Sequence, residues 1–336
     1  MPEFRESKSE DDGQKRSSGI SRAIGATSEE EKYVLGKFKD KFDNPGVSPD
    51  SEIGKYERAK TPEEIKIIEA ILSELPKFLE RYGVCALPIT LNHIHIIDSA
   101  NIEELKKKMD SVDTGAIYTP FDQLVAVFDS GNNLRNAQRI IHELIHFNSF
   151  QSIELDQVGI KSYRRVGFEV QVRKSQKNIY FNKLNEAITT ELSKKFDYEY
   201  FGDIPELGED FLERKSLVDS YKKNYPDKAD RVDDIAVIET AQEKEGEHKD
   251  KWKTTIESYT YYRERVALNK MIGEIYNKKK DEFESEEEVF NVFAKAAMTG
   301  NLMPATRLVE KVFGKGSFRK LGEDTKGSRD KKAKKE

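Results

Sequence analysis

Cysteine is nearly absent from this chain, with Cys85 the only one among 336 residues. A disulfide framework is therefore excluded, and a zinc site built on cysteine would lack ligands. The scarcity of cysteine also favours a reducing, cytoplasmic setting. We interpret Cys85 as a small core residue.

Long apolar runs and an excess of positive charge are missing as well. No uninterrupted apolar run approaches the roughly 18 residues that a membrane helix needs. The first 19 residues lack the apolar segment of a secretion signal. The formal net charge is −5, so no global field attracts nucleic acid. We expect a cytoplasmic protein that binds neither membranes nor nucleic acid.

The composition divides the chain into four parts. Residues 1–28 are polar with few large apolar groups, which predicts a disordered tail. Residues 322–336 are polar and basic, and we interpret them as a second, solvated tail. Between the tails we expect a catalytic region over 29–200 and a mainly helical subdomain over 201–321.

Histidine is also scarce, yet two of the five histidines enclose the motif HELIH, from His142 to His146. Residues four apart on an α-helix share a face, so both imidazoles can reach one metal ion. Glu143 is rotated by about 100° from His142, where it can flank the ion as a general base. The alternative is a pair of helix histidines without a metal.

The surroundings of the motif favour the metal. The helix is apolar on most of its circumference, which predicts that it is buried. A buried His-Glu-His face without a partner would be costly. The apolar segment LVAVF (124–128) precedes the helix and predicts a strand on which the helix packs.

A catalytic zinc site usually has three protein ligands and one open position. One class of HExxH proteins places a third histidine six residues after the second, where this chain has Ser152. The other class takes a glutamate from a later helix, and LNEAITTEL (184–192) supplies Glu186. Glu154, Asp156 and Glu191 remain alternatives.

HELIH followed by LNEAITTEL resembles the glutamate-zincin (gluzincin) superfamily of metallopeptidases, and most closely its small bacterial members. The resemblance covers roughly residues 115–196. It implies that His142, His146 and Glu186 bind Zn²⁺ and that Glu143 is the catalytic base. It also implies that the strand near 124–128 lines the cleft and pairs with an extended peptide or protein substrate. In those relatives an acid often stands where this chain has Thr190.

The predicted activity is zinc-dependent peptide-bond hydrolysis by a metal-bound water, with Glu143 as general base. The segment SYTYYRER (258–265) is expected on a helix, and ordinary packing and surface charge are our preferred interpretation of it. If it supplies a donor for the oxyanion, Tyr259 is the best single candidate. Two alternatives remain open. One is a non-catalytic regulatory or interaction protein with a structural zinc site, and the other is a peptidase dedicated to one regulatory protein.

The other histidines are assigned no role. His93 and His95 would share one face of an expected strand over 87–98, and we interpret that face as partly exposed. His248 lies in a charged segment that predicts a surface position.

The expected fold class is α+β and zincin-like, with a small mixed or antiparallel sheet packed on the motif helix and a mainly helical C-terminal half. Residues 163–181 predict a hairpin, and the charged stretch 225–252 predicts an irregular insertion. The expected helices are 61–84, 101–111, 133–150, 183–196, 285–298 and 306–316, the last ended by Gly314.

Overall fold

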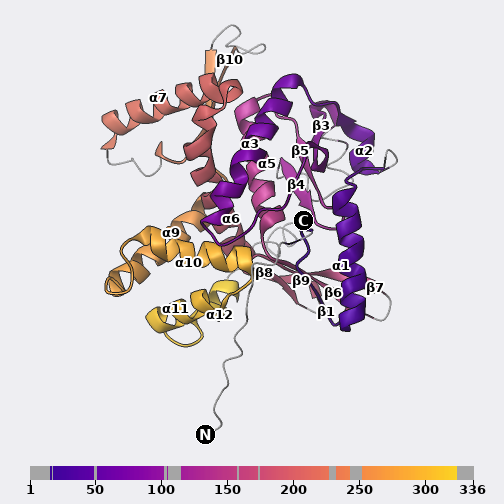
Figure 1. The fold of residues 1–336 in the computed structure, drawn as a ribbon. Coiled ribbons are helices and arrows are strands. Elements are labelled where there is room, and N and C mark those ends of the chain that lie inside the picture. The colour runs from indigo at the N-terminus through magenta and orange to yellow at the C-terminus, as the bar shows by residue number, and fades with distance from the viewer. Residues whose placement is uncertain are drawn as a thin grey trace, which may run out of the picture.

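The computed structural model describes residues 16, 18–48, 51–101, 104, 115–156, 159–172, 175–226, 232–242 and 252–323. Helices surround small sheets, so the fold is α+β as expected (Figure 1). The expected helix at 101–111 lies almost entirely outside the described residues. His248 lies outside them as well.

The sheet next to the motif helix is mixed. Its strand order is β2 (Glu57–Arg58), β3 (Ile94–Ile97), β5 (Leu124–Phe128) and β4 (Ala116–Thr119). Strand β5 runs parallel to β3 and antiparallel to β4. Since β5 has a partner on each side, it is an inner strand, and β4 forms the edge.

A second sheet has the order β1 (Arg22–Ile24), β6 (Gln151–Asp156), β7 (Gly159–Val166), β8 (Glu169–Val172) and β9 (Ser175–Tyr180). Strand β1 pairs parallel to β6, and the remaining pairs are antiparallel. The hairpin expected at 163–181 is therefore confirmed as part of a larger sheet. The tail expected at 1–28 is wrong for residues 18–27, because this segment pairs with β6 and buries Ile20 and Ala23.

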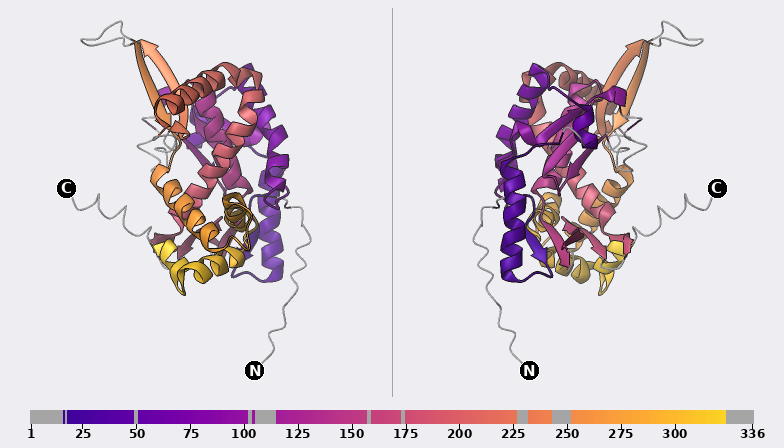
Figure 2. Two further views of the ribbon diagram at one scale, coloured as in Figure 1. Left: turned by 90° about the vertical axis from the view of Figure 1, so that its left-hand side faces the viewer. Right: turned by 90° about the vertical axis from the view of Figure 1, so that its right-hand side faces the viewer.

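The third sheet is a hairpin of β10 (Ile235–Gln242) and β11 (Trp252–Ser258). Figure 2 shows the two strands projecting from the body of the protein. Part of the stretch expected to be irregular, 225–252, is thus a regular strand. The C-terminal half is helical apart from this hairpin.

The helices begin and end largely where local signals predict. Thr61 and Glu64 form a reciprocal capping box, with Pro62 in the first turn. Gly314 ends its helix at φ +93°, as expected. The α-helices are α1 (Ser28–Asp43), α2 (Glu52–Tyr56), α3 (Pro62–Glu80), α5 (Asn133–Asn148), α6 (Asn182–Tyr200), α7 (Gly208–Asn224), α9 (Tyr262–Lys278), α10 (Glu286–Thr299), α11 (Met303–Phe313) and α12 (Ser317–Glu323).

One hydrophobic cluster runs from Phe42 to Phe318 and includes the inner faces of α3, α5, α6, α9 and α10. The regions expected as a catalytic part (29–200) and a helical subdomain (201–321) therefore share a core. Helix α5 lies at its centre, with Ile141, Leu144 and Ile145 fully buried. Burying each such side chain contributes about 1.5–3 kcal/mol, so α5 is held firmly.

Candidate metal centre

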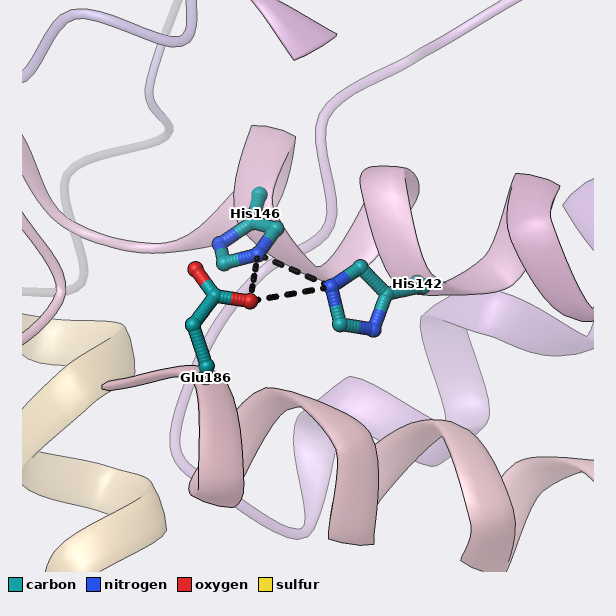
Figure 3. Close-up of side chains that lie close together, drawn as sticks. All are labelled: His142, His146 and Glu186. Atoms are coloured by element: carbon teal, nitrogen blue, oxygen red, sulfur yellow. Dashed lines mark hydrogen bonds and ion pairs between the residues drawn. The ribbon is translucent and has the colours of Figure 1, made fainter. Parts of the chain in front are cut away.

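Helices α5 and α6 bring the three candidate ligands together (Figure 3). Glu186 Oε2 lies 3.3 Å from His142 Nε2 and 3.5 Å from His146 Nε2, and the two nitrogens are 3.2 Å apart. Tetrahedral bonds of about 2.0–2.1 Å place neighbouring ligand atoms about 3.3–3.4 Å apart. The three side chains therefore fit one tetrahedral metal ion. Among the described residues this is the one such group of histidine, cysteine and acidic side chains.

Local sequence explains why the imidazoles are in place. Asn132 caps α5, because its side-chain oxygen accepts from the backbone N–H of Arg135 at 2.8 Å. At the other end, the Ser149 hydroxyl donates to the carbonyl of Ile145 at 2.9 Å. The apolar residues of the helix face the core, so the His142 and His146 face is turned toward α6.

The charges of the site favour a cation. Burial would lower the pKa of the His146 imidazole, but the carboxylates of Glu186 and Glu143 outweigh burial and raise this pKa to about 9. Burial likewise acts to raise the pKa of Glu186, but the two imidazoles outweigh it and hold this pKa well below its usual range. Two acidic side chains thus concentrate negative charge at a largely buried place.

Glu143 lines the same cleft as the three ligands and is 8% exposed. The cleft has a volume of about 820 Å³. Its walls come from β4, α5, α6, the ends of β7 and β8, the β10–β11 hairpin and the segment that follows β11. The candidate base and the candidate ligands therefore face one space large enough for a peptide segment.

The strand along this cleft is β4, with Ile117 and Tyr118 among the lining residues. The expectation that the strand near 124–128 lines the cleft is wrong. That strand is β5, which lies between β3 and β4 and contributes no residue to the cleft wall. Both segments are apolar, and only their pairing decides which becomes the edge.

Asn185, next to Glu186, connects α6 to the second sheet. Its side-chain oxygen accepts from the backbone N–H of Phe168 at 2.9 Å, in the turn between β7 and β8. The preceding Gly167 has φ +56°, a conformation that glycine adopts at little cost. The motif's asparagine thus positions the start of α6 and not the metal itself.

The other candidate third ligands lie elsewhere. Glu191 accepts from Arg265 at 3.0 Å, and Glu154 lies on β6, outside the cleft wall. The side chain of Asp156 is outside the described residues. Thr190 lines the cleft at 2% exposure, and its hydroxyl has no hydrogen-bond partner in the described part of the chain. Thr190 therefore does not steady a histidine as an acid at that position would.

Tyr259, chosen from the sequence as oxyanion donor, is already bonded within the protein. Its hydroxyl donates to Asp197 and accepts from Arg214 at 3.2 Å. The expected helix over 258–265 begins only at Tyr262, so Tyr259 and Tyr261 lie in the preceding loop. Tyr261, two residues on, lies beside a ligand, since its ring stacks on His142 with 6.4 Å between centroids. Loop conformation decides this difference, and residue spacing gave no signal of it.

The remaining sequence candidates are structural. His93 lies in the short 3₁₀ helix before β3 and is 2% exposed, with Nε2 2.9 Å from the carbonyl of Phe42. His95 is also buried and lies 2.8 Å from Glu57. The expected partly exposed histidine face is therefore wrong. Cys85 is exposed, so its interpretation as a core residue is wrong too.

No family model matches the chain, and no curated protein or solved structure shows detectable similarity to it. Within the described residues, no helix combines the length and apolarity needed to cross a membrane.

Proposed function

We propose that this protein is a zinc-dependent peptidase of the glutamate-zincin type. The observation that carries the proposal is the convergence of His142, His146 and Glu186 at tetrahedral spacing, with Glu143 lining the same cleft. Two imidazoles and one carboxylate are the ligand set of many catalytic zinc sites.

The protein residues have separate roles in this proposal. His142, His146 and Glu186 hold the ion. A bound Zn²⁺ supplies Lewis-acid activation of water and of the scissile carbonyl. Glu143 takes the proton of the attacking water and returns it to the leaving amine, a transfer that contributes about 10²–10⁴-fold in rate.

The substrate we propose is an extended peptide or a flexible segment of a protein. Strand β4 lies at the edge of its sheet and along the cleft. An extended chain adds to a sheet edge through backbone hydrogen bonds, which recognise peptides independently of side chains.

A purely structural zinc site is less well supported. Structural zinc sites are closed by four protein ligands, whereas catalytic sites keep one position open. Here the described residues supply three ligands, and the group faces a cleft.

The deciding experiment combines metal analysis with peptide hydrolysis for wild type, Glu143→Gln and Glu69→Gln. Glu69 is an exposed residue of α3 far from the cleft wall and serves as a matched control. We expect about one zinc ion per chain in all three proteins. Hydrolysis of a peptide library should fall at least about 100-fold in Glu143→Gln alone.

The other possible results of this experiment each lead to a different conclusion. Zinc bound by a wild type that cleaves no peptide would favour the structural site. Equal hydrolysis by wild type and Glu143→Gln would refute Glu143 as base. A wild type that binds no divalent ion would refute the metal centre itself.

A further inference from the structure

The β10–β11 hairpin brings a second sheet edge to the metal cleft. Glu257 and Ser258 of β11 both line the cleft. Successive side chains of a strand point to opposite faces of its sheet. A cleft that touches two successive residues therefore runs along the edge of the strand and not across one face. The same holds for β4, where Ala116, Ile117 and Tyr118 are successive lining residues.

The edge of β11 that meets the cleft pairs with no other strand among the residues that the structure describes. The hairpin is a sheet of two strands, and β10 occupies the other edge of β11. At the base of the hairpin, Ile235 of β10 packs with Val218 of α7. Beyond this base the two strands project from the body of the protein (Figure 2). A sheet edge of this kind presents backbone N–H and C=O groups with which an extended chain can pair.

Helix α5 fixes the position of the hairpin at two points. Arg135 Nη2 lies 2.9 Å from Glu257 Oε1, in an ion pair. Gln138 Nε2 donates to the backbone carbonyl of Ala236 at 2.9 Å. Arg135, Gln138 and His142 follow one another at intervals of three and four residues, so they lie on one face of α5. The helix that carries two of the candidate ligands therefore also holds the hairpin.

An irregularity in β10 makes the second of these contacts possible. The register shifts between Ile235 and Val237, so Ala236 has no residue opposite it on β11. The extra residue of such a bulge is left unpaired in the ladder. The carbonyl of Ala236 instead accepts from Gln138 and, at 3.0 Å, from the buried Arg214 of α7. The base of the hairpin is thus held from two helices.

The ion pair of Arg135 and Glu257 is the contact that can be changed without unfolding the protein. The Arg135 side chain is 15% exposed and that of Glu257 is 48% exposed. Ion pairs that water reaches contribute little to the stability of a fold. The buried contacts at Ala236 remain when this pair is broken. Replacing Arg135 should therefore shift the edge of β11 while the rest of the hairpin stays in place.

We propose that the β10–β11 hairpin is a substrate-binding arm of the cleft, and that Arg135 is a positioning residue that aligns the edge of β11 with the metal site. The occupant of this edge is the extended peptide substrate, because the edge borders the same cleft as the three candidate ligands and β4. A peptide bound there passes the metal site and continues along the hairpin through backbone hydrogen bonds. The inference rests on the proposed function and adds that affinity increases with the length of the peptide.

The test measures peptide binding by fluorescence anisotropy in the zinc-loaded Glu143→Gln protein, in which the bound peptide is not consumed. The probes are two fluorescein-labelled peptides of alternating threonine and glutamine, one of about four residues and one of about twelve, which spans about 40 Å when extended. Neither has a charged side chain, so reversing a charge on the protein does not change its attraction to the side chains of the peptide. We expect the longer peptide to bind at least about tenfold more tightly, the effect of one or two backbone hydrogen bonds.

Charge reversal tests the role of Arg135. Arg135→Glu should weaken binding of the longer peptide about tenfold and so remove most of its advantage over the shorter one. Combining Arg135→Glu with Glu257→Arg restores an ion pair of opposite polarity and should recover most of the lost affinity. Arg263→Glu is the matched control, because Arg263 is exposed and does not line the cleft, and it should leave the affinity for both peptides unchanged. Melting curves check that each variant is folded.

The outcomes separate this inference from the peptidase proposal. Equal affinity for the two peptides would overturn the inference, while hydrolysis of the peptide library by wild type would leave the peptidase standing. Length-dependent binding without any hydrolysis by wild type would support the arm and refute the peptidase. A charge swap that restores no affinity would overturn the role of Arg135. A protein that is dimeric in solution and binds neither peptide would assign the edge to a second copy of the chain and overturn the proposal.

Discussion

Gly167→Ala tests how the second sheet supports the start of α6. The added Cβ would lie 2.3 Å from the side-chain oxygen of Asn185, the atom that accepts from Phe168 N–H at 2.9 Å. Alanine at positive φ costs about 1–2 kcal/mol. Displacing Asn185 leaves a buried N–H unpaired, at a further cost of about 1–3 kcal/mol. We expect the free energy of unfolding to fall by about 2–5 kcal/mol in total.

Gly83→Ala separates the two contributions. Gly83 has φ +73° but open space around the added Cβ, so only the conformational cost of about 1–2 kcal/mol applies. The assay is urea unfolding of the metal-free proteins, followed by zinc titration. Zinc affinity should fall in Gly167→Ala alone, because Asn185 precedes Glu186. Equal destabilisation by the two substitutions would refute the role of the Asn185 hydrogen bond.

Three further predictions concern pH, the helix end and the ligand choice. Partial burial acts to raise the pKa of Asp129. Its hydrogen bonds, including those from Asn136 and Arg58, outweigh burial, so this pKa lies below its usual value. Asp129 thus stabilises the fold above about pH 4. Urea unfolding should show Asp129→Asn destabilised at pH 7, and its difference from wild type should shrink as the pH falls below about 4. Arg16 donates to the carbonyls of Asn148, the last residue of α5, and of Ser149, its C-cap. Arg16→Ala should therefore lower the free energy of unfolding by about 1–3 kcal/mol in the same assay. Glu186→Gln should abolish tight zinc binding in a metal analysis; zinc retained there would refute this ligand.

Local patterns determined the motif helix and its ligand face. The four-residue spacing of His142 and His146 places both imidazoles on one side of any α-helix, whatever the rest of the fold. The capping box of Thr61 and Glu64 also acts within one turn. These predictions hold because their physical causes lie within a few residues of each other.

Predictions that depended on distant pairing failed or were missed. Residues 22–24 are a run of three, Arg-Ala-Ile, too short to predict a strand. They become strand β1 only by pairing with β6, more than a hundred residues away. The segments 116–119 and 124–128 are both apolar, and β3 decides which is the edge by pairing with the second. Hydrogen bonding between strands supplies no local signal in either segment.

The sequence by itself determined which residue types could hold a metal, because helical periodicity and side-chain chemistry are local. Only the tertiary structure decided that Glu186 meets the two imidazoles and that the ring of Tyr261, not that of Tyr259, stacks on His142. The residues before Tyr261 are held by buried arginines, because Arg214 bonds the Tyr259 hydroxyl and Arg265 bonds the Thr260 carbonyl. Arg214 and Arg265 come from α7 and α9 and pair with Asp197 and Glu191 of α6, so this geometry exists only once these helices have packed.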